Sequence, residues 1–200
     1  NDFVLGLLKD YEVYVSLPDE VKTKELAEEG CKIIKTPINR RGVNPVEDFK
    51  LFLAYRMLMK EIRPDLVATY TIKPNIYGGM AAQSRRIPYI ETITGLGGAF
   101  DRKGLFLKLI VNLCRIGMKK AECIFFQNRE NRQIFRDFGI KGKSECLVNG
   151  SGVDLMRHTF EPYPTDEKCQ FLFVGRVMKE RGIVEFLEAA KKLHGENVEF

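Results

Sequence analysis

A turn near the C-terminal end of the chain carries two arginines that could bind an anion. A predicted strand ends at Gly175, a predicted helix begins after Gly182, and Arg176 and Arg181 lie between them. Free backbone N–H groups at a helix N-terminus attract anions, and a guanidinium group can bind two phosphate oxygens at once. The turn therefore predicts a diphosphate pocket. The alternative, which composition alone favours, is a solvated basic turn.

A second set of polar residues follows a predicted strand in the first half of the chain. Thr71, Lys73 and Asn75 come directly after the apolar run that ends at Tyr70. Ligands bind at the carboxyl ends of strands in an alternating β/α chain, so these side chains are candidates for contacts with a substrate. Lys73 could meet a phosphate as a mobile charge. In the alternative interpretation Asn75 caps the next helix and Lys73 is solvated.

A third group of candidates follows the next predicted strand. Thr94, Gly95 and Gly97 come after the apolar run that ends at Ile93, and Gly98 extends the group. Glycine lets the backbone approach a sugar or a phosphate closely. The same glycines could equally form a tight turn without a ligand.

The elements that would position these residues alternate between strand and helix. The clearest helix begins at Asn44, with Pro45 in its first turn and Glu47 in position for a capping box, and it stops before Arg63. Short apolar runs that do not alternate predict buried parallel strands, and the whole pattern predicts an α/β fold with a doubly wound, Rossmann-like parallel sheet. The predicted strands span residues 11–15, 31–34, 66–70, 89–93, 123–126 and 146–148.

The chain changes character near residues 161–166, where two prolines and polar residues predict a linker. We therefore expect an N-terminal domain over 1–163 and the start of a second domain of the same class over 164–200. In the second domain, residues 170–174 predict a strand and 183–193 a helix. The chain lacks an initiator Met and ends within a predicted strand, so we expect that the first strand of the N-terminal domain is missing and the second domain is truncated.

Composition narrows the classes of function. A net charge of +5 favours anionic partners without choosing among them. The five cysteines form no CxxC pair, so neither a zinc site nor a disulfide framework is expected. No GxGxxG motif follows a strand and no Walker A motif is present, which weakens the common nucleotide-binding modules. No basic patch is interleaved with aromatic residues, so nucleic-acid binding is not predicted. No apolar run reaches the roughly 20 residues of a transmembrane helix.

The segment 102–120 is apolar and basic and contains no acidic residue. That composition suits a helix at the surface of an anionic membrane. The alternative is a core-facing helix whose basic residues point to water.

Five pieces of the chain, in order, resemble the retaining GT4 family of glycosyltransferases, which have the two-domain GT-B architecture. The resemblance covers nearly the whole chain, and the first piece is most similar to bacterial members that build capsule, O-antigen and lipid-linked oligosaccharides. The pieces are Thr69 to Gly79, Thr94 to Gly97, Phe125 to Asn128, Gly150 to Asp154, and Phe173 to Arg176 together with Arg181-Gly182.

This resemblance implies transfer of a sugar, with retention, from a nucleotide-sugar donor, commonly a UDP-sugar. The acceptor is lipid-carried or a polysaccharide, and neither a metal nor another cofactor is needed. It implies a cytoplasmic enzyme, with any membrane contact at the inner face of the plasma membrane. It assigns the donor diphosphate to Gly175, Arg176 and Arg181, with Arg181 standing where Lys is usual. It assigns the acceptor to the N-terminal domain, with these candidates: Thr71, Lys73, Asn75, Thr94, Gly95 and Gly97.

The chain departs from the family pattern in three further ways. No histidine follows Thr94 near the reacting sugar, so no catalytic residue is assigned. The glycine loop after the first strand is expected before Asn1, and the paired glutamates that hold the donor are expected beyond Phe200. These 200 residues alone are therefore expected to be inactive. Two rivals remain: a sugar-nucleotide 2-epimerase of GT-B fold, which needs acid/base side chains not found here, and a non-catalytic nucleotide- or phosphate-binding α/β module.

Overall fold

The computed structural model describes residues 2–18, 23–39, 44–96, 100, 104–156, 158–162, 168–193 and 197–200. The chain divides into two compact units, Asn1–Asp154 and Leu155–Phe200. The predicted domain boundary between residues 163 and 164 lies outside the described residues.

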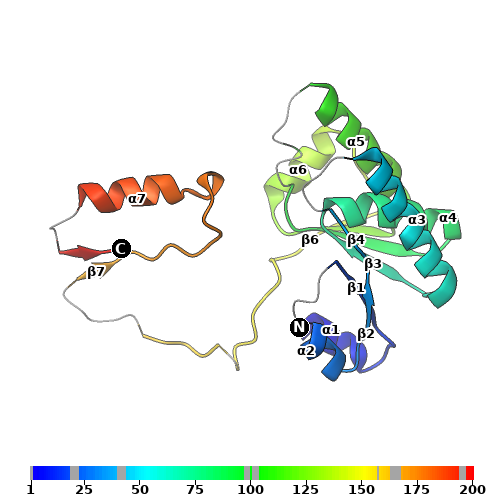
Figure 1. Cartoon of the computed structure of the whole chain (residues 1–200), viewed down its shortest axis with the longest axis horizontal. Coiled ribbons are helices and arrows are strands. Elements are labelled where there is room, and N and C mark those ends of the chain that lie inside the picture. The colour runs from blue at the N-terminus through cyan, green and yellow to red at the C-terminus, as the bar shows by residue number, and fades with distance from the viewer. Residues whose placement is uncertain are drawn as a thin grey trace. The chain divides into compact units, whose positions relative to one another are not determined.

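The first unit contains a four-stranded, all-parallel sheet with the strand order β3-β4-β5-β6 (Figure 1). Helices alternate with its strands, as expected for a parallel α/β sheet. The strands are β3 (Val67–Tyr70), β4 (Tyr89–Ile93), β5 (Cys123–Phe126) and β6 (Glu145–Leu147). The helices around them are α3 (Pro45–Ile62), the π-helix η1 (Pro74–Gly78), α4 (Gly79–Arg85), α5 (Leu105–Met118) and α6 (Arg129–Asp137).

The N-terminal part of this unit forms a separate pair of parallel strands, β1 (Tyr14–Leu17) and β2 (Lys32–Lys35). They are accompanied by α1 (Asp2–Leu8) and α2 (Thr23–Glu28). β1 begins three residues later than predicted and Tyr11 is exposed. The predicted parallel α/β pattern is confirmed, and each of the six predicted strands overlaps an observed one.

The core of the first unit packs tightly where α5 crosses the start of α4. A Cβ atom at Gly79 would lie 2.5 Å from the carbonyl oxygen of Gly117, and one at Gly117 would lie 2.7 Å from the carbonyl oxygen of Ile76. Neither position tolerates a side chain without a backbone shift. The surrounding core includes Ala81, Ala82, Tyr89, Ile93, Cys114, Met118, Ile124, Phe126 and Phe135.

Helix α3 forms as predicted, because the Asn44 side chain caps it by accepting from the backbone N–H of Val46 at 3.0 Å. The apolar repeat of the sequence does not mark the buried side of this helix, since all four of its members are exposed: Val46, Phe49, Leu53 and Met57. The buried row is instead Asp48, Leu51, Tyr55 and Met59.

The second unit is built from β7 (Cys169–Gln170), the 3-10 turn η3 (Lys179–Arg181), α7 (Ile183–Lys192) and β8 (Val198–Glu199). β7 and β8 pair in parallel, and α7 lies along them (Figure 1). Phe186 of α7 contacts the rings of Phe173 and Phe200 at centroid distances of 5.6 and 5.5 Å. The predicted strand 170–174 is much shorter than expected, because the ladder with β8 ends at Gln170.

Candidate functional site

The loop after β3 bears a strained residue at its first position. Thr71 is exposed and has φ of +69°, in the left-handed region that a β-branched residue rarely adopts. Its carbonyl accepts the backbone N–H of Asn75 at 3.0 Å, which starts η1. Strain of this kind costs on the order of 1–3 kcal/mol and concentrates at functional sites. The predicted acceptor residue Thr71 therefore lies in a constrained turn at the carboxyl end of the sheet.

Lys73 forms a mostly buried ion pair, which neither interpretation drawn from the sequence included. Its ammonium lies 2.7 Å from Oδ1 of Asp48 on α3, and its side chain is only 17% exposed. The hydroxyl of Tyr77 donates to the other oxygen of Asp48 at 3.0 Å. Burial, assisted by this carboxylate, raises the pKa of Tyr77. Asp48, which sequence reasoning did not single out, thus ties both residues to α3.

Asn75 links the two candidate acceptor loops from inside the protein. Its side chain is fully buried, and its Nδ2 donates to the carbonyl of Thr92 at 3.1 Å. It therefore holds the end of β4 against η1, and its side chain does not cap the helix. Its Oδ1 has no hydrogen-bond partner among the described residues.

The loop after β4 lies beside the loop after β3. β3 and β4 are parallel neighbours, and Tyr70 is in register with Thr92, so Thr94 and Thr71 follow at the same edge of the sheet. Thr94 is exposed and Gly95 is half-buried with open space around its Cα. Gly97 and Gly98 lie outside the described residues. The structure thus brings the described members of the acceptor set together at one edge.

A buried carboxyl lies on β4, next to the start of α4. Glu91 of β4 is fully buried, and neither of its oxygens has a hydrogen-bond partner among the described residues. Burial raises the pKa of Glu91 to about 9, so it is a neutral acid at pH 7. Its strand neighbour Thr69 has a buried, unpaired hydroxyl as well. The sequence feature that could have identified Glu91 is its position in β4. It lies two residues from both Tyr89 and Ile93, and side chains two residues apart are on the same face of a strand.

The predicted donor residues lie together on one exposed turn of the second unit. Gly175, Arg176 and Arg181 are all exposed, and neither guanidinium makes a hydrogen bond or ion pair with a described residue. Arg181 ends η3, and Gly182, with φ of +81°, turns the chain into α7. The first N–H groups of α7 have no partner within the helix. The turn before α7 thus carries two cations without partners among the described residues, and Glu185 adds a negative charge to the first turn of the helix.

The described residues hold no group of three or more His, Cys, Asp and Glu side chains placed to bind a metal ion. A membrane-spanning helix is also not found in the part of the chain that the structure describes.

Comparison with known proteins identifies the family. Residues 1–128 match the family described as glycosyl transferase 4-like, and this is more than half of the chain. The chain belongs to this family. A curated relative is 27% identical over 210 residues, namely the N,N'-diacetylbacillosaminyl-diphospho-undecaprenol alpha-1,3-N-acetylgalactosaminyltransferase of Campylobacter jejuni. The match covers 95% of the chain and 56% of that relative, so the chain spans little more than half of the relative's length.

Solved structures of glycosyltransferases share the fold at low sequence identity. A glycosyltransferase from Rickettsia africae matches with a TM-score of 0.59 at 16% identity, covering 96% of this chain and 52% of the other. HepE from Anabaena, solved with UDP, matches with a TM-score of 0.57 at 16% identity, covering 80% and 42%. MurG from Acinetobacter baumannii matches with a TM-score of 0.52 at 15% identity, covering 96% and 50%. The predicted GT4 membership and GT-B type α/β fold are confirmed.

Proposed function

We propose that this chain is part of a glycosyltransferase that moves a sugar, with retention, from a nucleotide-sugar donor of the UDP type to a lipid-carried or polysaccharide acceptor. Membership of the glycosyl transferase 4-like family supports sugar transfer. The relative from Campylobacter is named for a sugar linked to diphospho-undecaprenol, which supports a lipid-carried acceptor. We propose that the product is part of a bacterial surface polysaccharide. Such an enzyme would work at the inner face of the plasma membrane.

The observation that carries the donor side of this proposal is the exposed turn before α7. Negative charge builds on the nucleotide diphosphate as the glycosidic bond breaks. Fixed cations at that position lower the barrier because they stabilise the transition state more than the ground state. Arg176 and Arg181 are unpaired among the described residues and therefore need not break an existing ion pair to bind the leaving group. The protein's role is thus electrostatic, and the proposal includes no metal or other cofactor.

The acceptor side is assigned to the edge where β3 and β4 end. Thr71 and Thr94 are exposed there and are proposed to contact the acceptor directly, with Gly95 beside them leaving room for it. Gly97 stays a candidate for the acceptor set on its sequence position alone. Asn75 is buried and is proposed to position the acceptor loop indirectly. Its hydrogen bond to the Thr92 carbonyl holds the end of β4, from which the loop with Thr94 and Gly95 begins. Lys73 offers the acceptor a charge already shared with Asp48, so it binds phosphate less strongly than a free lysine would.

We propose that the 200-residue chain alone does not catalyse sugar transfer. The match spans only 56% of the relative from Campylobacter, which supports this proposal.

A transfer assay on a longer polypeptide tests the function. The chain, lengthened at both ends to the size of its relatives, is screened with UDP-sugars and a lipid-diphosphate-linked sugar acceptor. NMR then determines the anomeric configuration of the product. Transfer with retention is the expected result. Reversible epimerisation of the UDP-sugar without an acceptor, or binding without turnover, would contradict the proposal.

A further inference from the structure

Helix α5 exposes an apolar row that the core of the protein does not use. Its inner side is buried in the core through Ile110, Val111, Cys114 and Met118. On its outer side Leu105, Leu109 and Ile116 are 84%, 49% and 49% exposed. These three residues are four and seven positions apart and therefore form one row along the helix. A helix that only covers a core needs a single apolar side, so the outer row requires another explanation.

A basic row runs directly beside this apolar row. Lys108 and Lys119 lie three positions after Leu105 and Ile116, and Arg115 lies between them on the same side of the helix. Lys120 follows at the C-terminal end. All four cations are exposed, and none of the lysine side chains has a hydrogen-bond or ion-pair partner among the described residues. The sequence from Gly104 to Lys120 contains no acidic residue.

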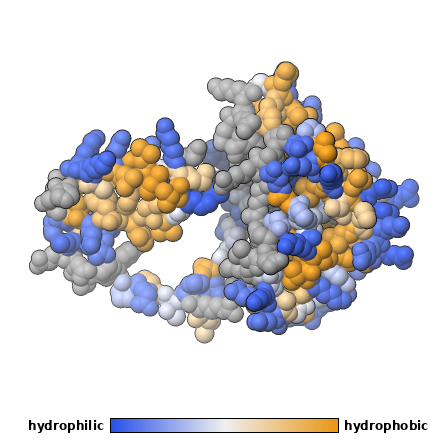
Figure 2. Space-filling view, viewed as in Figure 1, coloured by the Kyte–Doolittle hydropathy of each residue, from blue (hydrophilic) through white to orange (hydrophobic). Residues whose placement is uncertain are grey.

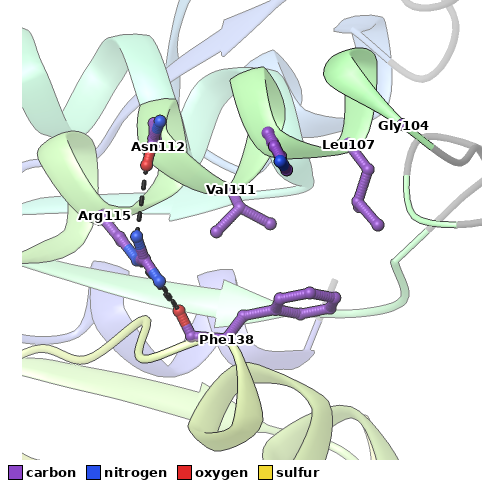
Figure 3. A pocket seen from close by; sticks show the side chains of 7 residues that line it. Gly104, Leu107, Val111, Asn112, Arg115 and Phe138 are labelled. Carbon is purple, nitrogen blue, oxygen red and sulfur yellow. Dashed lines mark hydrogen bonds between the residues drawn. The ribbon is translucent and has the colours of Figure 1, made fainter.

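A groove lies beside the basic row, on the side away from Leu105, Leu109 and Ile116. It has a volume of about 490 Å³, and its lining includes Leu107, Val111 and Phe138 together with Lys108 and Arg115. The guanidinium of Arg115 donates to the Phe138 carbonyl at 2.9 and 2.6 Å and to Asn112 at 3.2 Å (Figure 3). Arg115 is therefore held in place and still has N–H groups to donate. Figure 2 shows hydrophobic and hydrophilic surface side by side at the upper end of this unit, where the start of α5 lies in Figure 1.

We propose that this outer face of α5, made of Leu105, Leu109, Ile116 and the four cations, docks on the surface of an anionic lipid bilayer. Cations without carboxylates complement an anionic surface, and exposed aliphatic side chains enter the region between headgroups and acyl chains. α5 stays packed on its own core, so the contact is peripheral. This inference rests in part on the proposed function, because a lipid-carried acceptor requires the enzyme to reach a bilayer. All residues of this face lie in the described part of the chain, and their binding to a bilayer can be measured without sugar transfer.

Vesicle flotation tests the docking face in the absence of donor and acceptor. The chain is mixed with phosphatidylcholine vesicles with or without about 30% phosphatidylglycerol. It is expected to float only with the anionic vesicles and to be released by high salt, since surface charges are screened within about 8 Å at physiological ionic strength. Replacing three lysines (Lys108→Gln, Lys119→Gln and Lys120→Gln) is expected to lower the partition coefficient roughly a hundredfold, because each lysine near an anionic surface contributes about a fivefold effect.

A matched control removes the same charge elsewhere. The triple variant Lys24→Gln, Lys50→Gln and Lys60→Gln changes exposed lysines of α2 and α3 and is expected to float like the unchanged chain. A second variant, Leu105→Gln with Leu109→Gln, keeps the charge and is expected to weaken binding as well, with circular dichroism confirming that it folds. Failure of the unchanged chain to bind anionic vesicles, or equal loss in the control triple variant, would overturn the proposal. The proposal would also be overturned if the Leu105→Gln, Leu109→Gln variant had a different oligomeric state from the unchanged chain and still floated to the same extent. None of these results bears on whether the lengthened enzyme transfers sugar.

Discussion

The buried carboxyl of Glu91 makes the stability of this protein depend on pH in a defined direction. The side chain is fully buried with both oxygens unpaired among the described residues, and burial raises its pKa from 4.5 to about 9. The folded state therefore keeps a proton that the unfolded state has lost over the whole interval between these values. The free energy of unfolding is therefore not reduced by Glu91 below pH 4.5, and it decreases as the pH rises from 4.5 toward 9.

The slope has a maximum of about 1.4 kcal/mol per pH unit for one proton. Between pH 6 and pH 8 the free energy of unfolding should therefore fall by roughly 3 kcal/mol. Domains of this kind have only about 5–15 kcal/mol of stability in total, so this change is easily measured. Urea denaturation followed by circular dichroism at pH 6, 7 and 8 gives the free energy at each pH.

Two variants isolate the contribution of Glu91. Glu91→Gln keeps the shape and removes the titrating group, so it should abolish most of the slope whatever its effect at pH 6. Glu61→Gln changes an exposed carboxylate on α3 and should leave the slope intact. A flat profile in the unchanged chain, or an unchanged slope in Glu91→Gln, would refute the assignment of a buried neutral acid.

Two further predictions concern packing and the ion pair. Asp48→Ala leaves the ammonium of Lys73 mostly buried without its carboxylate, so thermal denaturation should reveal a loss of roughly 3 kcal/mol; a loss below about 0.5 kcal/mol would mean that the pair is not formed. Gly117→Ala places a Cβ 2.7 Å from the carbonyl oxygen of Ile76 and should cost about 1–3 kcal/mol. Gly6→Ala, with no atom within 4 Å of the new Cβ, is its matched control and should not destabilise the protein; equal losses in both would contradict the close helix crossing.

Much of the architecture could be predicted because it depends on local sequence. The strands are short apolar runs, and the α3 cap is set by Asn44 and its immediate neighbours. The side of α3 that is buried could not be predicted in the same way. The helix carries two apolar rows, and the choice of the inner row depends on partners such as Lys73, which is 25 residues from Asp48 in the sequence.

The candidate site was predicted in its location and only partly in its contacts. Residues after β3 and β4 were expected at one sheet edge because parallel strands place their carboxyl ends together, and the register of the two strands agrees. The ion pair of Lys73 and the burial of Asn75 depend on how η1 packs against α3 and β4, which no local pattern encodes. The burial of Glu91 could not be predicted, because a lone acidic residue in a strand forms no motif and its burial depends on the helices packed against the sheet.

The electrostatic role of Arg176 is the central claim of this account. In the lengthened, active polypeptide, kcat for sugar transfer is measured for Arg176→Ala and for Lys191→Ala, which removes an exposed cation at the far end of α7. Loss of a leaving-group contact should lower kcat about 10²–10³-fold in Arg176→Ala, while Lys191→Ala should keep the original rate. An unchanged kcat in Arg176→Ala would contradict the claim that this turn stabilises the departing diphosphate.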